Sequence, residues 1–410
     1  MSRKLELDSS MDAREMEEEI EAHPDCNDLY LNCVELDIEA CSLIAKLAAT
    51  RMWKSIEVEE CTGEGVNYLL SVLLQQRVER VKLISLSFER FDETVMFAIA
   101  MAIKNNNHLN DIILTMTLDQ TGAQILQRGL AGSSLERFCL WDCRLDIPAV
   151  EALSKGLQSV KKLNEFGLVA CAQNDYCLHL VTNSFIHHSS LTRLDLRCLA
   201  SSIDPIANLL QENNNLVSLD LSFRSGNQTI EVPRLAAAAR DHPSLRCLHL
   251  CGNQLTDDDV GDIMESALSL FTLNLSMNSI TDIGADIISD LIANNEGSLK
   301  RLLLENNPMT ESGADSLLQG ISMNTELIEL SLPHEFPEVQ YRVNYYARLN
   351  QGGRRLVVKN IDLPAGLWSR VIERANKMEW DESEWEDRLN ESGRADITFC
   401  LLHGPIFFPI

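Results

Sequence analysis

The chain has 410 residues, of which 45% are hydrophobic and only 6% aromatic, so aliphatic side chains can build a large apolar core. Its 61 acidic and 35 basic residues give a formal net charge of −26. Because phosphate binding needs a basic surface, this balance argues against a nucleic-acid partner. A basic protein partner and simple solubility both stay open as reasons for the acidity.

The N-terminal residues predict an intracellular protein. Met-Ser-Arg-Lys-Leu-Glu-Leu-Asp lacks the apolar region of a secretory signal, and no apolar run in the chain reaches 18 residues. We therefore expect no membrane span and a place in the cytoplasm, with the nucleus left open. The 12 cysteines include no Cys-x-x-Cys motif, so we expect free thiols in a reducing compartment.

Residues 1–24 hold eight acids and three bases, including the run from Arg14 to Glu21. A segment with this charge pattern is usually solvated. We expect an acidic N-terminal tail, partly helical or disordered, in preference to a specific acidic docking arm.

A repeat begins at residue 26. Its clearest copy has leucine at positions one, four, six and eleven, from Leu245 to Leu255, and Asn253 at position nine. Copies in the same phase recur with a mean period of about 27 residues, which predicts about 12 repeats. Their first residues are Cys26, Trp53, Val81, Leu109, Leu135, Leu163, Leu191, Leu216, Leu245, Leu270, Leu299 and Leu327.

Each copy predicts one strand and one helix. The alternating leucines suit a short strand, and apolar residues spaced by three and four, such as Ile287, Ile288 and Leu291, suit an amphipathic helix. Thr281 stands where it can cap that helix. Stacked copies predict an α/β horseshoe solenoid over residues 25–336, with parallel strands on the concave face and helices on the convex face.

The ninth position of the repeat carries either asparagine or cysteine. An inward asparagine can bond backbone groups where the chain leaves the strand, and cysteine there is a small buried filler. The residues are Asn253, Asn278, Asn307, Cys61, Cys143 and Cys171. This mixture, in units of about 25 to 29 residues, resembles the ribonuclease-inhibitor class of leucine-rich repeats over residues 26–335.

The period stops after Leu332, and a different pattern follows. Residues 338–350 and 364–376 predict helices, and residues 379–390 predict an acidic loop. We expect residues 337–410 to form a helical C-terminal module that caps the last repeat, because an uncovered solenoid end exposes apolar surface.

Part of this C-terminal module resembles a segment of known proteins. The string from Tyr346 to Leu356, followed by Trp368, is similar to the C-terminal segment of many leucine-rich-repeat proteins of diatoms and related algae. That segment has no defined activity, so the resemblance implies a cap and no chemistry.

No catalytic or nucleotide-binding motif occurs, and His334-Glu335 lacks the second histidine of a zinc-protease motif. We predict neither an enzyme nor a cofactor. Cys247, His249 and Cys251 share one strand face, but neighbouring ligand atoms there stand about 6–7 Å apart and no fourth ligand is evident. We predict no metal, with binding by these three residues left open.

The concave face holds the candidate docking residues. Side chains alternate along a strand, so residues flanking the inward leucines face the concave side. Trp141 with Arg137, Arg193 and Arg197 combines the residue types of interface hot spots. The alternative is that Trp141 only packs on a neighbouring strand. The full predicted partner-binding set is Arg137, Trp141, Arg193, Asp195, Arg197, Asp220 and His249.

Three functions stay open at this point. The first is a non-catalytic interaction scaffold or recognition module that binds a protein on its concave face. Ran GTPase-activating proteins are also similar, but their acidic segment is C-terminal and the densest acidic run here is N-terminal. A ubiquitin-ligase substrate adaptor is third, because residues 1–25 are too short for an F-box. The oligomeric state is not predicted.

Overall fold

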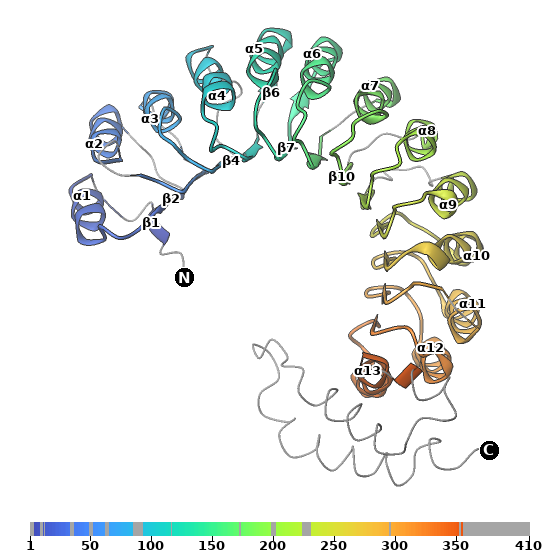
Figure 1. Ribbon diagram of the computed structural model, residues 1–410. Coiled ribbons are helices and arrows are strands. Elements are labelled where there is room, and N and C mark those ends of the chain that lie inside the picture. The colour runs from blue at the N-terminus through green and yellow to red at the C-terminus, as the bar shows by residue number, and fades with distance from the viewer. Residues whose placement is uncertain are drawn as a thin grey trace.

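The computed structural model describes residues 4–8, 11, 13–32, 37–48, 52–61, 65–84, 93–115, 117–171, 174–197, 202–223, 231–294, 297–351 and 354–355. In these residues the chain curves as a horseshoe, with strands along the inner edge and helices along the outer edge (Figure 1). The predicted fold class, a leucine-rich-repeat solenoid, is confirmed.

One open sheet of 13 strands lines the inner edge, and every neighbouring pair is parallel and follows chain order. A separate two-stranded sheet pairs β6 (Thr117–Leu118) with β8 (Arg144–Leu145). The strands of the large sheet are β1 (Lys4–Asp8), β2 (Asp28–Asn32), β3 (Ser55–Glu59), β4 (Arg80–Ile84), β5 (Asp111–Leu114), β7 (Arg137–Trp141), β9 (Glu165–Val169), β10 (Arg193–Asp195), β11 (Ser218–Asp220), β12 (Cys247–His249), β13 (Thr272–Asn274), β14 (Arg301–Leu303) and β15 (Glu329–Ser331).

A helix follows each strand of the large sheet and packs against the helices of the units before and after it. The helices are α1 (Ala13–Ala22), α2 (Ile38–Ala48), α3 (Val66–Leu73), α4 (Glu93–Asn105), α5 (Gln120–Leu130), α6 (Ile147–Leu157), α7 (Asp175–Phe185), α8 (Asp204–Glu212), α9 (Val232–Asp241), α10 (Asp257–Ser266), α11 (Asp282–Ala293), α12 (Glu311–Met323) and α13 (Pro337–Gln351), with a short 3-10 turn η1 (Ala267–Ser269).

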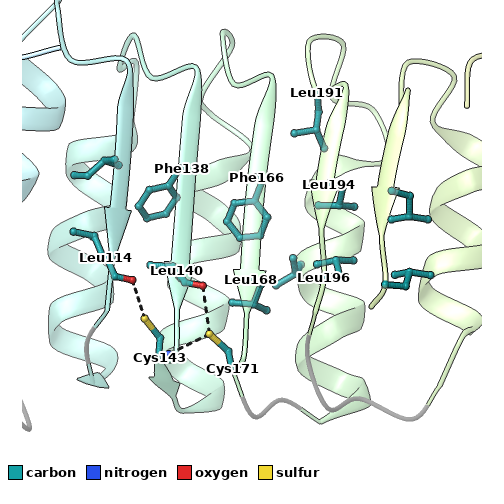
Figure 2. Packing of buried hydrophobic residues seen from close by; sticks show 14 of the residues in the cluster. Leu114, Phe138, Leu140, Cys143, Phe166, Leu168, Cys171, Leu191, Leu194 and Leu196 are labelled. Atoms are coloured by element: carbon teal, nitrogen blue, oxygen red, sulfur yellow. Dashed lines mark hydrogen bonds between the residues drawn. The ribbon is translucent and has the colours of Figure 1, made fainter. Parts of the chain in front are cut away.

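The core lies between the sheet and the helices. Inward side chains of successive units stack in columns, as Leu140, Leu168 and Leu196 do in Figure 2, and all three are at most 1% exposed. Phe138 and Phe166 widen one column, with ring centroids 6.2 Å apart. Burying each such side chain contributes about 1.5–3 kcal/mol, so the stack depends on contacts that no single unit can make.

The N-terminal residues form a unit of the solenoid, which differs from the solvated tail that the charge count predicted. Strand β1 pairs in register with β2, and Leu5 and Leu7 are buried. Helix α1 buries Met16 and Ile20, one helical turn apart, against the same core. The acidic residues of α1 lie on its solvent-facing side. Their charge therefore gives no information about the apolar side of the helix, which packs on the core.

The C-terminal side of the stack is closed by α13, close to the predicted helix at 338–350. Val339, Val343 and Ala347 join the main core, and α13 contacts α12 and β15. The predicted helical cap is therefore present in this stretch. The expected helix at 364–376, the acidic loop at 379–390 and Trp368 lie outside the described residues, and the boundary between the solenoid and a C-terminal module stays a prediction.

The ninth-position residues bond successive units together. Cys143 N donates to Cys171 Sγ at 3.2 Å, and Cys171 Sγ lies 3.6 Å from Leu140 O (Figure 2). Asn278 makes the same two bonds further along, accepting from Asn253 N at 2.9 Å and donating to Leu250 O at 3.0 Å. Cysteine is thus a hydrogen-bonding equivalent of asparagine here, and more than the filler we expected.

A second polar column, which the sequence analysis missed, stands three residues before the first leucine of several units. Asn213 and Asn324 each donate to a carbonyl of the preceding unit and accept from the backbone ahead of the next strand. His242 does the same, with Nε2 2.6 Å from Asn213 O and Nδ1 accepting from Leu245 N at 2.9 Å. This pattern requires the neutral imidazole, with its proton on Nε2.

The first prediction concerns close packing of neighbouring helices. A Cβ on Gly129, in α5, would lie 2.6 Å from the carbonyl oxygen of Ala100 in α4, whereas a Cβ on Gly261, in α10, would meet nothing within 4 Å. We expect Gly129→Ala to lower the free energy of unfolding by about 1–3 kcal/mol and Gly261→Ala to raise it by about 0.5–1 kcal/mol. Chemical denaturation of both variants measures this, and effects of the same sign would contradict the packing argument.

The second prediction concerns pH. Burial lowers the pKa of His242 from its ordinary value of 6.5, so the unfolded chain binds more protons than the folded chain below that value. The free energy of unfolding should therefore fall as the pH drops from about 6.5 towards 5. His242→Asn, which copies Asn213 and Asn324, should lose less stability over this range. Urea midpoints of both proteins at the two pH values test this, and parallel losses would count against His242.

Candidate functional site

A row of alternating charges runs across five neighbouring strands of the concave face. Its members share one register position and are Arg80 on β4, Asp111 on β5, Arg137 on β7, Glu165 on β9 and Arg193 on β10. Arg80 Nε lies 2.8 Å from Asp111 Oδ2, and Arg137 Nε lies 2.7 Å from Glu165 Oε1. Two longer pairs, Arg137–Asp111 at 3.6 Å and Arg193–Glu165 at 3.7 Å, complete this charge ladder.

Arg197, the remaining predicted arginine, forms a second ion-paired group. Its Nε and Nη2 lie 2.9 and 2.6 Å from the two carboxylate oxygens of Asp195, and Asp220 is 3.8 Å away. The hydrogen bonds to Asp195 raise the pKa of the Arg197 guanidinium. Of the predicted arginines, Arg137 and Arg197 are therefore held by hydrogen bonds to carboxylates, whereas the Arg193 side chain is 69% exposed.

A small apolar cluster lies on the concave side of the sheet, separate from the main core. It consists of Ile84, Ile113 and Cys139, at most 8% exposed each, with Trp141 half-buried against them. We call these four residues the concave patch. Lys82 Nζ stands 5.9 Å from the centroid of the Trp141 ring and is ion-paired with Glu57. Trp141 thus packs on neighbouring strands, as in the alternative interpretation of its role. Part of its side chain stays exposed to solvent.

The Cys139 side chain fits in this patch without a steric clash because its neighbour on β9 is a glycine. A Cβ on Gly167 would come within 2.8 Å of Cys139 Sγ. Burial raises the pKa of the Cys139 thiol to about 12, so the group is neutral at physiological pH and serves as apolar surface.

A hollow of about 310 Å³ lies beside the concave patch. Asp111 stands in its wall and is only 7% exposed. Its Oδ2 is paired with arginine, whereas its Oδ1 receives no hydrogen bond from the described part of the chain. A buried acceptor without a donor costs about 1–3 kcal/mol. This concave hollow is lined by Ser55, Ile56, Glu57, Arg80, Lys82, Asp111, Ile113, Arg137 and Trp141.

The structure brings some of the predicted residues together and separates others. Asp195 and Asp220 are register partners, and Asp220 faces His249. His249, however, lies on β12, four strands from the β7 strand of Trp141, and strands are about 4.8 Å apart. His249 therefore belongs to a different part of the face.

Five concave residues of strands β4 and β5 escaped the sequence analysis, because the repeat matches are weak at Val81 and Leu109. Strand parity applied to those two units would have placed all five on the concave face. They are Arg80, Lys82, Ile84, Asp111 and Ile113.

Cys247, His249 and Cys251 are all half-buried, and burial raises the pKa of the Cys251 thiol. Across the part of the chain that the structure describes, no group of three or more His, Cys, Asp or Glu side chains is placed to hold a metal ion. Within the same residues, every helix is too short or too polar to cross a membrane.

Two curated relatives share the repeat. The chain is 26% identical over 326 residues to mouse NACHT, LRR and PYD domains-containing protein 14, covering 76% of this chain and 32% of that protein. It is 26% identical over 288 residues to pig ribonuclease inhibitor, covering 68% of this chain and 62% of that protein. The chain is a leucine-rich-repeat solenoid, and its repeats are similar to those of the pig ribonuclease inhibitor. This leucine-rich-repeat solenoid spans less than two thirds of the length of either relative.

No family model matches the leucine-rich-repeat solenoid. Among solved structures, an internalin from Listeria monocytogenes aligns with 78% of this chain and 88% of its own, at 15% identity and a TM-score of 0.40. That score is too low to carry an argument. The resemblance of the C-terminal segment to proteins of diatoms and related algae stays a prediction.

The third prediction separates the surface tryptophan of the leucine-rich-repeat solenoid from a core tryptophan. Trp53 is 2% exposed, whereas Trp141 is only half-buried. We expect Trp53→Ala to cost about 3–5 kcal/mol of unfolding free energy and Trp141→Ala less than about 1.5 kcal/mol. Denaturant titration of the two variants measures the difference. A cost at Trp141 equal to that at Trp53 would make it a structural residue.

Proposed function

We propose that this chain is a non-catalytic scaffold that binds a protein partner on its concave face, around the concave patch. The observation that carries the proposal is the half-open Trp141 over three buried apolar side chains, on a face otherwise rich in paired charges. Partly exposed aromatic residues ringed by polar groups are typical of interface hot spots, because a partner can exclude water from them.

The charge ladder supports this role energetically. The Arg137 guanidinium is already held by its hydrogen bond to Glu165, so this arginine would lose little side-chain freedom when a partner docks there. Alternating signs also make the surface selective, because a partner with the wrong charge at one position meets a like charge. The ladder therefore suits specificity around the patch more than raw affinity.

The relatives are consistent with this proposal. The name of the pig relative states that it inhibits a ribonuclease, which is itself a protein. From this relative we carry over to this chain only the general mode of binding, which is the recognition of another protein. The net charge of −26 favours a partner whose surface is basic overall.

The two alternatives, a GTPase activator and a ligase adaptor, stay predictions. We see no feature of the described residues that favours either of them over the scaffold. A GTP-hydrolysis assay of small GTPases with added chain decides the first, since unchanged rates would remove it.

The fourth prediction tests the docking surface. We expect the triple variant Trp141→Ala, Arg193→Ala, Arg197→Ala to recover its partner from native lysate at least about tenfold less than wild type, because it removes the hot-spot residues. The matched control is Phe97→Ala, on the convex helix α4, whose side chain is 60% exposed. The control should recover the partner as wild type does.

Equal recovery by wild type and the triple variant, with the same proteins in both, would place the docking surface elsewhere. Circular dichroism of each protein confirms that the solenoid is intact before capture. Loss of recovery by the Phe97→Ala control alone would point to the convex face.

A further inference from the structure

The charge ladder holds one more positive charge than negative charge. Its three arginines alternate with two carboxylates, so an arginine stands at each end. Beyond Arg80, the residue in register on β3 is Ser55, which carries no charge. Arg80 therefore has a ladder carboxylate on one side only, and this open end of the ladder lies in the wall of the concave hollow.

We infer that the concave hollow receives an acidic side chain of the protein partner, aspartate or glutamate. Its carboxylate lies between Arg80 and Arg137, and an apolar side chain of the same partner packs on Ile113 and Trp141. The inference rests on the proposed function and specifies the chemistry of its contact.

Both arginines are accessible and keep unused hydrogen-bond donors. The side chains of Arg80 and Arg137 are 63% and 35% exposed. Each donates one hydrogen bond through its Nε, Arg80 to Asp111 and Arg137 to Glu165. A guanidinium has five N–H donors, so within the described residues the terminal nitrogens of both arginines have no hydrogen-bond partner. Paired N–H donors of this kind fit the two oxygens of a carboxylate.

Asp111 holds the two arginines close together. Its Oδ2 lies 2.8 Å from Arg80 Nε and 3.6 Å from Arg137 Nη1, and its side chain is 10% exposed. Arg137 also pairs with Glu165, whereas Arg80 has no second ion pair among the described residues. Because Arg80 is far more exposed than Asp111, an incoming carboxylate meets the cation at the surface and is attracted more than it is repelled.

The apolar wall of the hollow begins two residues further along the sheet. Ile113 follows Asp111 by two positions on β5, which is a rise of about 6.6 Å, and both residues line the hollow. Trp141 lines it too and is half-buried. Residues i and i+2 of an extended partner segment have the same spacing and share one face. One face of such a segment can therefore supply the carboxylate and the apolar side chain together.

Other groups fit the charge balance less well. Lys82, in the same wall, is ion-paired with Glu57 and leaves the surplus of one positive charge unchanged. A lysine or arginine of the partner would add to this surplus. A phosphorylated side chain carries about −1.5 to −2 charges, which exceeds it. Glutamine has the shape of glutamate but makes only neutral hydrogen bonds, which are weaker. A single carboxylate matches the surplus in sign and amount.

An acidic side chain at this point agrees with a partner whose surface is basic overall. The net charge of a partner acts on its approach over distances of about 10 Å. One carboxylate acts on the two arginines only after contact, when water has been excluded from around it.

The test uses the full chain labelled with ¹⁵N at tryptophan and four acetylated peptide amides, Gly-Leu-Gly-X-Gly, in which X is glutamate, glutamine, lysine or phosphoserine. Trp141→Phe assigns the indole signal of Trp141. At low salt we expect the glutamate peptide to shift this signal with millimolar affinity, at least about fivefold more tightly than the glutamine peptide. The phosphoserine peptide should bind no more tightly than the glutamate peptide, and the lysine peptide should bind weakest. Salt at about 0.5 M should reduce the preference for glutamate over glutamine to about twofold or less.

Two matched arginine variants locate the carboxylate. Arg80→Gln should reduce the low-salt preference for glutamate over glutamine to about twofold or less, because it removes the positive charge at the open end of the ladder. Arg301→Gln is the control, since Arg301 has the same register position on β14 and pairs with Glu329. It should leave the preference unchanged. The wild-type comparison and its salt dependence stand even where a variant fails to fold.

Equal binding of the glutamate and glutamine peptides at low salt overturns the inference, and so does tightest binding of the lysine or phosphoserine peptide. No shift of the Trp141 signal with any peptide, or an unchanged preference in Arg80→Gln, overturns it as well. In each of these cases the capture experiment still decides the proposed function by itself. A glutamate preference together with undiminished capture by the triple variant would overturn the partner contact.

Discussion

The hydrogen bond from a ninth-position side chain to a carbonyl of the preceding unit is the interaction on which the solenoid depends. Where each strand ends, backbone groups turn inward and away from water, and ninth-position side chains of the same and of the next unit satisfy them. Asn307 donates to Leu275 O at 3.0 Å and, through its Oδ1, accepts from Ile280 N. The units are therefore joined by polar bonds as well as by stacked leucines.

This arrangement leaves the side chains of the concave face outside the main core. Since alternate side chains of each strand are committed to the main core, the residues between them lie on the opposite face of the sheet. In this protein they carry a run of ion pairs from Arg80 to Arg193 and the separate cluster around Trp141. One continuous sheet holds both, so these residues from several units are arranged side by side.

The repeat was readable in the sequence because its leucines recur at a fixed interval, and the strands and helices of units such as the one at Leu245 follow directly. The first unit could not be recognised in the sequence, because its core residues Met16 and Ile20 stand among the charged residues of α1. The role of His242 also escaped notice, since it is visible only as a hydrogen bond to another unit.

The candidate site was predictable in part. Strand parity places Trp141, Arg137 and Arg193 on one face, and that placement needs only the repeat. It also puts Glu165 in register between the two arginines, because each of the three residues stands two positions after the first residue of its unit. It does not tell that Asp111 Oδ1 lacks a donor, since that depends on side-chain contacts between units, which no local pattern reports.

The interruption of the charge ladder has a mechanical consequence. Beyond Arg193 the same register position holds Ser218, Cys247 and Thr272, and charges return only with the Arg301–Glu329 pair. Cross-strand ion pairs oppose any change in spacing along the inner edge of the arc, whereas uncharged side chains resist it less. We expect the horseshoe to bend most readily at β11–β13, so that its two arms can open or close around a bound object while the stretch near Trp141 keeps its curvature.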